Sequence, residues 1–462
     1  MAQQGIRILT EGKIFEQLIR LAMPIMATGF LQMAYTLTDM AWLGRLGSEE
    51  MAAVGAMGII IWFLSSIALL TKVGAEISIA HSIGAKQWEK ARIFASHTVT
   101  LSVIISLFIV GIVFLTMDPV ITLFKLNAKL TEMARQYLQI TLPALPLVFL
   151  TYTFSGIYNG IGRTSFPFYF MAAGLFANML LDPLLIFGIG GFASMKTQGA
   201  AVATAFSQLL VVLLFVRKMK QKDGILNRFP YFIRLQKSYS WVIFKLGAPT
   251  AAMNCLFAAI NFYMARIASI HGGHLGVMSQ TTGGQIEGIT WNTSQGFSTA
   301  LGTFVAQNHA ARKPERTVKA YRYTLMTLLS LGVVITCSFF IAGKEIFSLF
   351  VKEEPARIAG GEYLHIMAFC QLFMMLEITT MGIWNGYGRT VPPAIISIVF
   401  NLARIPLALS LAPAFGITGV WIALTISAIL KGMISPLAWQ IVYHKQIKPQ
   451  EKKSKFTFRR SE

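Results

Sequence analysis

Long apolar segments, each followed by a short polar loop, recur along the whole chain. Each segment is close to the ~20 residues that a helix needs to cross the hydrocarbon core of a bilayer. The pattern predicts an all-α membrane protein with twelve transmembrane helices. Their expected spans are 14–41, 51–80, 94–117, 132–158, 164–189, 199–217, 240–269, 277–306, 321–342, 359–384, 391–412 and 418–442.

Composition supports this interpretation. Charged residues make up 13% of the chain, whereas a soluble domain carries about 25%. The net charge of +20 can indicate a nucleic-acid-binding protein. Here the basic residues gather in the loops and do not alternate with aromatic residues as they do in nucleic-acid-binding motifs. We therefore expect the lipid bilayer as a partner and no nucleic acid.

The distribution of charge over the loops predicts the orientation. One set of loops is rich in Lys and Arg, and it includes the run from Arg217 to Lys237 and the C-terminal sequence KKSKFTFRR. The opposite set has few basic residues, with Asp or Glu beside several of them. Because basic loops stay on the cytoplasmic side, both termini are expected in the cytoplasm.

The chain also repeats itself at an offset of 225 or 226 residues. YNGIGRT at 158–164 recurs as WNGYGRT at 384–390, and RLAMPIMAT at 20–28 is echoed by KLGAPTAAM at 245–253. Two copies of a six-helix unit therefore follow each other. Since six helices return the chain to its starting side, we expect two six-helix bundles related by a pseudo-two-fold axis along the membrane normal.

The repeat predicts the domains and limits the function. The expected domains are an N-terminal lobe at 1–220, a basic linker at 221–239, a C-terminal lobe at 240–442 and a basic tail at 443–462. Two lobes around a cleft suit alternating access, with substrate bound near the membrane midplane. The sequence has no Walker A loop and no nucleophile–base arrangement. We therefore expect a transporter driven by an ion gradient, neither an enzyme nor a cofactor-binding protein.

Two acidic residues lie inside predicted membrane helices. Asp39 lies near the outer end of the first helix, and Asp182 lies in the middle of the fifth, one turn after Asn178. Charged groups at membrane depth are costly and indicate function, although Asp39 has the alternative of facing water outside. Two carboxyl groups and an amide in an apolar pocket can hold a proton or bind Na⁺ through hard oxygen atoms.

With these features in place, several motifs together resemble the MATE family of multidrug and toxic-compound exporters. The resemblance covers essentially the whole chain and is closest to the DinF-like branch of bacteria and archaea. It implies the two-lobed fold and an export activity. The motifs are TDMAWLGRLGSEEMAAVG at 38–55, AHSIGAK at 80–86, YNGIGRT at 158–164, NMLLDP at 178–183, GAAVAT at 199–204 and QIEGITWNTSQGFSTALGTFVAQN at 285–308, besides Pro24.

The resemblance implies an ion-coupling site in the N-terminal lobe. The family positions match Asp39, Asn178 and Asp182, which are also the possible Na⁺ ligands. Thr204 matches less closely, because the length of the loop before GAAVAT makes the alignment with the family loose. Ala200 is the competing position if no gap is allowed.

Pro24 is the predicted hinge of the first helix. Proline removes a backbone hydrogen bond and permits a bend, and some family members are thought to bend this helix on protonation. A static kink is the alternative.

The second lobe differs from the first. Ile405 stands where an echo of Asp182 is expected, and Arg404 precedes it. Other branches of the family carry an acid in the seventh helix, near the place of Phe257 in this chain. These departures favour ion coupling in the N-terminal lobe.

Two acids of the second lobe are predicted to bind substrate or a cation. Glu287 lies in QIEG, which is similar to the eighth-helix motif of the family; its alternative is a structural partnership with Arg266 or Arg404. Glu377 lies in the tenth helix, about one turn after the position that carries an acid in other branches, where this chain has Met374.

Gln32, Tyr35 and Asn159 are predicted as further substrate contacts. Gln32 and Tyr35 share a helix face with Asp39, whereas Asn159 has the alternative of capping a helix end. An apolar and aromatic cleft with a few carboxylates and flexible Met side chains suits lipophilic cations.

The predicted function is therefore a multi-pass antiporter of the bacterial inner membrane. It exports cationic or lipophilic drugs and toxic small molecules in exchange for H⁺ or Na⁺ by alternating access, and it works as a monomer because one chain holds both lobes. A flippase for lipid-linked precursors, from the same superfamily, is the first alternative, and it would need a cationic cleft. An ion channel or a membrane scaffold is the second.

Overall fold

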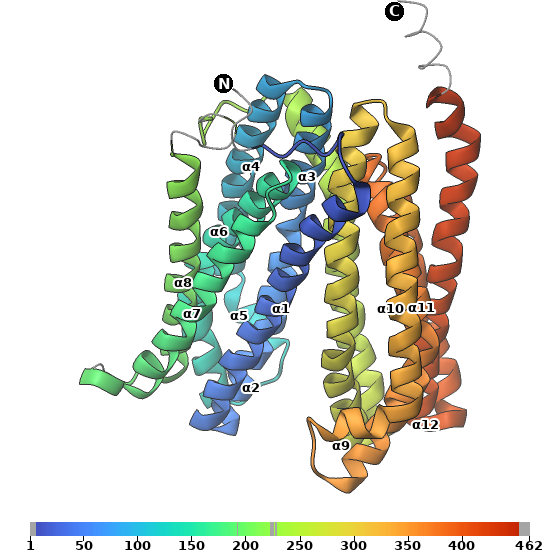
Figure 1. The fold of residues 1–462 in the computed structure, drawn as a ribbon. Coiled ribbons are helices and arrows are strands. Elements are labelled where there is room, and N and C mark those ends of the chain that lie inside the picture. Colours follow the sequence, from blue (N-terminus) through green and yellow to red (C-terminus); the bar gives the residue numbers. More distant parts are fainter. Residues whose placement is uncertain (1–5, 192, 222–225, 227–228, 452–462) are drawn as a thin grey trace, which may run out of the picture. The chain divides into compact units, whose positions relative to one another are not determined.

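The computed structural model describes residues 6–191, 193–221, 226 and 229–451. This part of the chain is helical and contains no strand (Figure 1). Apolar segments become helices in a membrane because each backbone N–H and C=O must find its partner within the segment. The elements are α1 (Ile14–Leu46), α2 (Ser48–Ile67), α3 (Leu69–Gly84), α4 (Trp88–Leu115), α5 (Met117–Thr122), α6 (Ala128–Gly160), α7 (Ser165–Phe187), η1 (Ile189–Gly191), α8 (Lys196–Met219), α9 (Lys237–Ala310), α10 (Pro314–Ser348), α11 (Glu354–Gly386), α12 (Val391–Val442) and the π-helical η3 (Tyr443–Ile447).

Ten helices in the described part are long and apolar enough to cross a membrane, with α2 and α3 forming one continuous crossing. Two of the ten contain two crossings each, because α9 and α12 break at Gly273 and Gly416. With φ of 55° and 59° and ψ of −148° and −140°, both glycines adopt a conformation that is nearly closed to other residues. The described chain thus has the twelve crossings that the sequence predicts.

The chain divides into two compact units. Unit 1 contains the residues up to Ile8 and Ala27–Cys255, and unit 2 contains Leu9–Met26 and the residues from Leu256 onwards. The divisions fall inside α1 and inside α9. Leu9–Met26, at the start of the first repeat, therefore belongs to unit 2. The start of the second repeat, up to Cys255 in α9, belongs to unit 1.

The domain boundaries predicted at 220, 239 and 442 describe the sequence copies and stay a prediction. Residues 222–225 and 227–228 of the predicted linker and 452–462 of the predicted tail lie outside the described residues.

The same close helix packing occurs once in each unit. In unit 1, Cβ atoms added to Gly156 and Gly160 of α6 would come within 2.3 and 2.7 Å of backbone oxygen atoms of α3. In unit 2, Cβ atoms added to Gly382 and Gly386 of α11 would meet backbone oxygen atoms of α9 at 2.5 and 2.8 Å. Small residues four apart allow two membrane helices to approach this closely. The sequence repeat is therefore also a repeat of helix packing.

An apolar cluster in unit 1 holds the helices that carry the predicted ion site. It joins Leu43 of α1, Leu142 of α6, Ile186 of α7 and Ala201 of α8, all of them buried. Because packed interiors leave little room for adjustment, this cluster fixes the second half of α1 against α6, α7 and α8.

Candidate functional site

Asn178 and Asp182 lie one turn apart on α7, and both side chains are fully buried. Asn178 Nδ2 donates a hydrogen bond to Asp182 Oδ1 over 3.3 Å. Among the described residues, no Lys or Arg pairs with the Asp182 carboxyl group, whose interacting neighbours are Asn178 and Asp39. α7 thus carries an acid and an amide on one face, as their spacing in the sequence predicts.

The second half of α1 brings Tyr35 and Asp39 to this pair. The Asp39 carboxyl group interacts with that of Asp182, and the Tyr35 hydroxyl group lies beside Asp39 and the Thr204 hydroxyl group of α8. The structure therefore brings the four predicted ion-coupling residues together. Four oxygen atoms of this site are buried without a hydrogen-bond partner among the described residues: Tyr35 Oη, Asp39 Oδ1, Asn178 Oδ1 and Asp182 Oδ2.

These oxygen atoms fit a proton or a hard cation. Two neighbouring carboxyl groups in an apolar interior cannot both carry a charge at low cost, so a bound proton removes their repulsion. Carboxylate, amide and hydroxyl oxygen atoms are also the ligand types that hard cations take. Either ion would provide a partner for oxygen atoms that the described part of the chain leaves without one.

Two other predicted residues lie elsewhere on α1. Gln32 is exposed, and its side chain lies beside the Tyr152 hydroxyl group of α6. Pro24 lies inside α1, which continues as a helix through it. Pro24 also lies two residues before the division between the units at Met26. Their roles in substrate binding and in bending stay predictions.

Asn159 of α6 lies far from Asp39 and Asp182. It is buried near the end of this helix, and its Nδ2 donates to Glu76 Oε2 of α3 over 3.4 Å. Tyr137, a neighbour of Asp39, precedes Asn159 by 22 residues (159 − 137) on the same helix, which is about 33 Å along the axis. A substrate role for Asn159 stays a prediction, at a different depth from the ion site.

In unit 2, Glu287 of α9 is held by two neutral side chains of α11. Tyr363 Oη donates to Glu287 Oε1 over 2.5 Å, and Gln371 Nε2 donates to Glu287 Oε2 over 3.1 Å. Arg266 is exposed and forms no ion pair with Glu287 within the described part of the chain. Glu287 is therefore a member of a polar network in the interior of unit 2.

Glu377 of α11 forms a buried ion pair with Lys431 in the second half of α12. Lys431 Nζ lies 3.1 Å from Glu377 Oε2, and the Ser397 hydroxyl group donates to Oε1 of the same carboxylate. Buried charges persist when they are paired and hydrogen-bonded. Lys431 was not predicted from the sequence, although a lysine inside the apolar run 418–442 is an intramembrane charge like that of Asp39.

Arg404 lies near both carboxylates, on the first half of α12. Its guanidinium group interacts electrostatically with Glu287 and Glu377. Its Nε donates to Ser427 Oγ over 3.1 Å, and its Cζ lies 5.6 Å from the centre of the Phe257 ring. The network in unit 2 therefore contains two acids and two bases.

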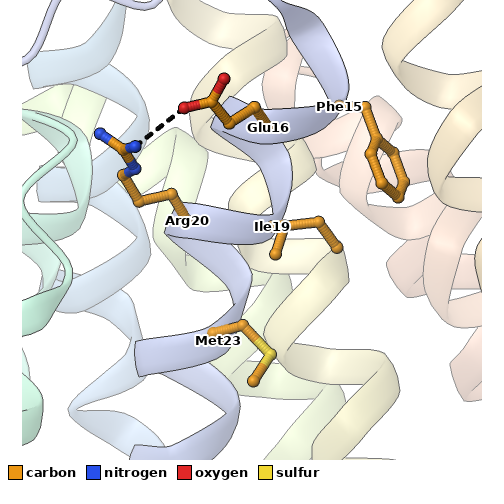
Figure 2. A pocket seen from close by; sticks show the side chains of 5 residues that line it. All are labelled: Phe15, Glu16, Ile19, Arg20 and Met23. Atoms are coloured by element: carbon orange, nitrogen blue, oxygen red, sulfur yellow. Dashed lines mark hydrogen bonds and ion pairs between the residues drawn. The ribbon is translucent and has the colours of Figure 1, made fainter.

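A hollow of about 470 Å³ lies on the first part of α1, within unit 2 (Figure 2). An ion pair between two exposed side chains borders it, with 2.8 Å between Glu16 Oε1 and Arg20 Nη2. The lining residues are Phe15, Glu16, Ile19, Arg20 and Met23. None of the predicted site residues lines this hollow, so it is a surface feature separate from the buried acids.

Comparison with known proteins gives the family. The MatE family profile matches the chain twice, over residues 24–184 and 249–409. The two matches begin and end 225 residues apart (249 − 24 and 409 − 184). This confirms the internal repeat and the two-lobed fold predicted from the sequence.

Individual proteins match over almost the whole chain. A probable multidrug resistance protein NorM of Thermotoga maritima is 27% identical over 435 residues and covers 92% of each chain. An FAD transporter of Shewanella oneidensis is 26% identical over 433 residues and covers 92% of this chain and 94% of its own. A crystal structure of MATE in the bent conformation matches with a TM-score of 0.89, 21% identity and coverage of 96% of this chain and 98% of its own. The last similarity shows the fold.

Together, the helices and the matches define the class of protein. Ten described helices can cross a membrane, and the similar proteins include multidrug exporters. The chain is therefore a multi-pass membrane protein of a transporter family in which drug export is the general activity. It belongs to the MatE family, the multidrug and toxic-compound extrusion transporters.

Proposed function

We propose that this chain exports cationic or lipophilic small molecules in exchange for H⁺, with Na⁺ as the alternative coupling ion. The observation that carries this proposal is the group of buried oxygen atoms of Tyr35, Asp39, Asn178 and Asp182, which lack partners among the described residues. An ion that binds there changes the charge of unit 1. Such a change drives transport only if the ion binds one conformation more tightly than the other.

The cycle follows from that difference in affinity. In the outward-open state, Asp39 and Asp182 take up a proton, and the substrate leaves. The protonated carrier turns to the cytoplasmic side by alternating access, where the proton is released and a new substrate binds. Protonation allows this step because it removes the repulsion between two buried carboxylates.

The setting of the proposal is the bacterial inner membrane. Both termini lie in the cytoplasm, as the basic loops predict. The chain acts as a monomer without a cofactor, since one chain holds both repeats and the coupling ion supplies the energy. Glu287, Glu377, Gln32, Tyr35 and Asn159 are the proposed substrate contacts.

A second candidate is the transport of molecules with an anionic group. The FAD transporter among the similar proteins supports it, and so does the buried Arg404 in unit 2. The flippase alternative for lipid-linked precursors needs the same kind of cationic group. The basic residues of unit 2 are balanced by Glu287 and Glu377, however, which favours the cation exporter.

Efflux of a fluorescent cationic dye from proteoliposomes tests the main proposal. Wild type and Asp39→Asn are compared under an imposed ΔpH or ΔNa⁺. We expect ΔpH to drive export by the wild type, and the variant to be inactive because an amide cannot take up the proton. Asp118→Asn is the matched control, since Asp118 is an exposed acid that pairs with Arg135 at 2.8 Å.

The outcomes separate the coupling ions. If only ΔNa⁺ drives export and Asp39→Asn fails, the site binds sodium. Normal gradient-driven export by Asp39→Asn would exclude coupling through the acidic pair of unit 1.

A further inference from the structure

Arg404 uses few of its hydrogen-bond donors within the protein. A guanidinium group carries five N–H donors, and in Arg404 only Nε donates to a described residue, the Ser427 hydroxyl group. Nη1 and Nη2 donate to no described residue. Arg404 as a whole is only 8% exposed, but its Nη atoms are not among the fully buried polar atoms that lack a partner. Two adjacent N–H groups are therefore available to an acceptor from outside.

The nearby carboxylates do not take these donors. Glu377 is engaged by Lys431 and Ser397. Both oxygen atoms of Glu287 accept hydrogen bonds from α11. Both acids attract Arg404 through space, but neither forms an ion pair with it among the described residues. Arg404 is thus the base of the network whose pairing is incomplete.

Asn401 adds a second group beside Arg404. It precedes Arg404 by three residues on α12, so the two share a helix face. Asn401 is 3% exposed, and its Oδ1 is buried without a partner among the described residues. Its amide Nδ2 is a further donor. Two polar side chains on one face therefore have hydrogen-bonding capacity that unit 2 does not use.

An aromatic ring completes the arrangement. Phe257 lies 5.6 Å from Arg404 Cζ, measured to the ring centre. The guanidinium group of Arg404 therefore lies over an aromatic ring, a contact that cation–π attraction stabilises. A planar guanidinium group binds carboxylate or phosphate with two N–H···O bonds at once.

We propose that Arg404 and Asn401 form a binding subsite in unit 2 for the oxyanion group of an aromatic substrate. The Arg404 Nη atoms hold the oxyanion, Asn401 donates to it, and Phe257 packs against the aromatic part. This proposal rests on the second candidate function, the transport of molecules with an anionic group. It names the substrate class as aromatic molecules with a phosphate or carboxylate group.

Equilibrium binding to the purified full-length protein tests the subsite. The probes are flavin mononucleotide and riboflavin, which share the same fluorescent ring system and differ by one phosphate group. We expect the wild type to bind flavin mononucleotide about tenfold or more tightly than riboflavin, as a charge-assisted pair requires. Equal binding of the two probes, or no binding of flavin mononucleotide, would overturn the proposal.

Substitution of Arg404 locates the effect. Arg404→Gln should remove the preference for flavin mononucleotide and leave riboflavin binding unchanged. Arg404→Lys should keep part of the preference, because it retains the charge and loses the fork. Arg266→Gln is the matched control, an exposed arginine of the same unit, and it should behave as the wild type. Equal loss of both probes in Arg404→Gln would show a structural role and contradict the subsite.

A variant that gains affinity covers the case in which Arg404→Gln does not fold. Glu287→Gln removes a negative charge that attracts Arg404 and repels an anion. The affinity for flavin mononucleotide should rise severalfold relative to the affinity for riboflavin, and a folding defect cannot produce such a gain. Weaker or unchanged binding of flavin mononucleotide by this variant would count against the proposal.

These binding results are independent of the coupling test. A normal result for Asp39→Asn in dye export would defeat the proposed ion coupling and leave the phosphate preference of Arg404 as measured. Loss of the phosphate preference would defeat the subsite and leave proton-driven export of cations intact.

Discussion

The predicted sites of the two units bury charge in opposite ways. Unit 1 holds Asp39 and Asp182 with neutral neighbours and no basic partner among the described residues. Unit 2 holds two acids together with Arg404 and Lys431, and Lys431 forms a buried ion pair with Glu377 at 3.1 Å. The same six-helix architecture thus supports one unbalanced site and one balanced network.

The difference arises on equivalent helices. Asn178 on α7 and Asn401 on α12 occupy matching places in the repeat, and each is buried. One turn after Asn178 the chain has Asp182, whereas the matching place after Asn401 holds Ile405, with Arg404 immediately before it. An unbalanced buried acid pair responds to an added proton or cation. A network with balanced charges has less to gain from a cation and more to lose from the removal of one member.

The largest expected effect comes from the unbalanced site. Asp39→Asn, Asp182→Asn and the double variant should each abolish ion-driven dye export, and the double variant should be no worse than either single one. Residues that act as one unit show such non-additive losses. Initial export rates in proteoliposomes at fixed ΔpH measure this.

Partial export by the single variants would contradict this contrast between the two units. If the two single variants each retain partial export and their losses multiply in the double variant, the two carboxyl groups act independently, and unit 1 does not contain a single coupled pair.

The next effect concerns the stability of the balanced network. Lys431→Met leaves the Glu377 carboxylate buried without its partner, which should lower the free energy of unfolding by about 3–5 kcal/mol. The double variant Glu377→Gln/Lys431→Met should recover most of the loss. Thermal unfolding of the purified protein in detergent measures both.

Unit 1 supplies the contrast for this measurement. Asp39→Asn should leave the unfolding temperature unchanged or raise it, because it relieves a repulsion between like charges. An equal drop in stability for Asp39→Asn and Lys431→Met would show that the two charge arrangements do not differ in this respect.

The smallest effect concerns the turn between the fifth and sixth crossings of each repeat. Unit 1 makes this turn with Gly188 at φ 75° and ψ 35°, in the left-handed region that Asn also adopts. Unit 2 makes it at Gly416, with φ 59° and ψ −140°, which is nearly closed to residues with a side chain. Gly188→Asn should therefore be tolerated, and Gly416→Asn should cost about 1–3 kcal/mol.

Unfolding temperatures of the two glycine variants check this difference. Gly284→Asn is a control for side-chain size, since nothing lies within 4 Å of a Cβ atom at this position of α9. Equal tolerance of Asn at Gly188 and Gly416 would show that the break in α12 does not depend on glycine.

Several features of the site could be predicted from single positions. Asp39 and Asp182 stand out because an acid in an apolar helix is rare and costly, and Asn178 follows from the helical period. Lys431 carried the same signal and was missed. Tyr363 and Gln371, which hold Glu287, could not be found in this way, because neutral polar residues are common in membrane helices and only a contact distinguishes them.

Thr204 shows a limit of another kind. The length of the loop before GAAVAT makes the alignment with the family loose, so Thr204 and Ala200 stayed as alternatives in the sequence. The structure places the Thr204 hydroxyl group beside Tyr35 and buries Ala200 in the apolar cluster of unit 1. Packing decided which side chain of α8 faces the acids.

The twelve crossings, the repeat and the acids at membrane depth follow from the sequence alone. These depend on local rules, namely the length of apolar segments, the period of the helix and the cost of charge in lipid. The pairing of Glu377 with Lys431 depends on tertiary packing, and so do the two Arg404 nitrogen atoms that have no partner among the described residues. Glu377 and Lys431 are 54 positions apart in the sequence (431 − 377) and lie on different helices. Which side chains meet across two helices depends on how the helices pack.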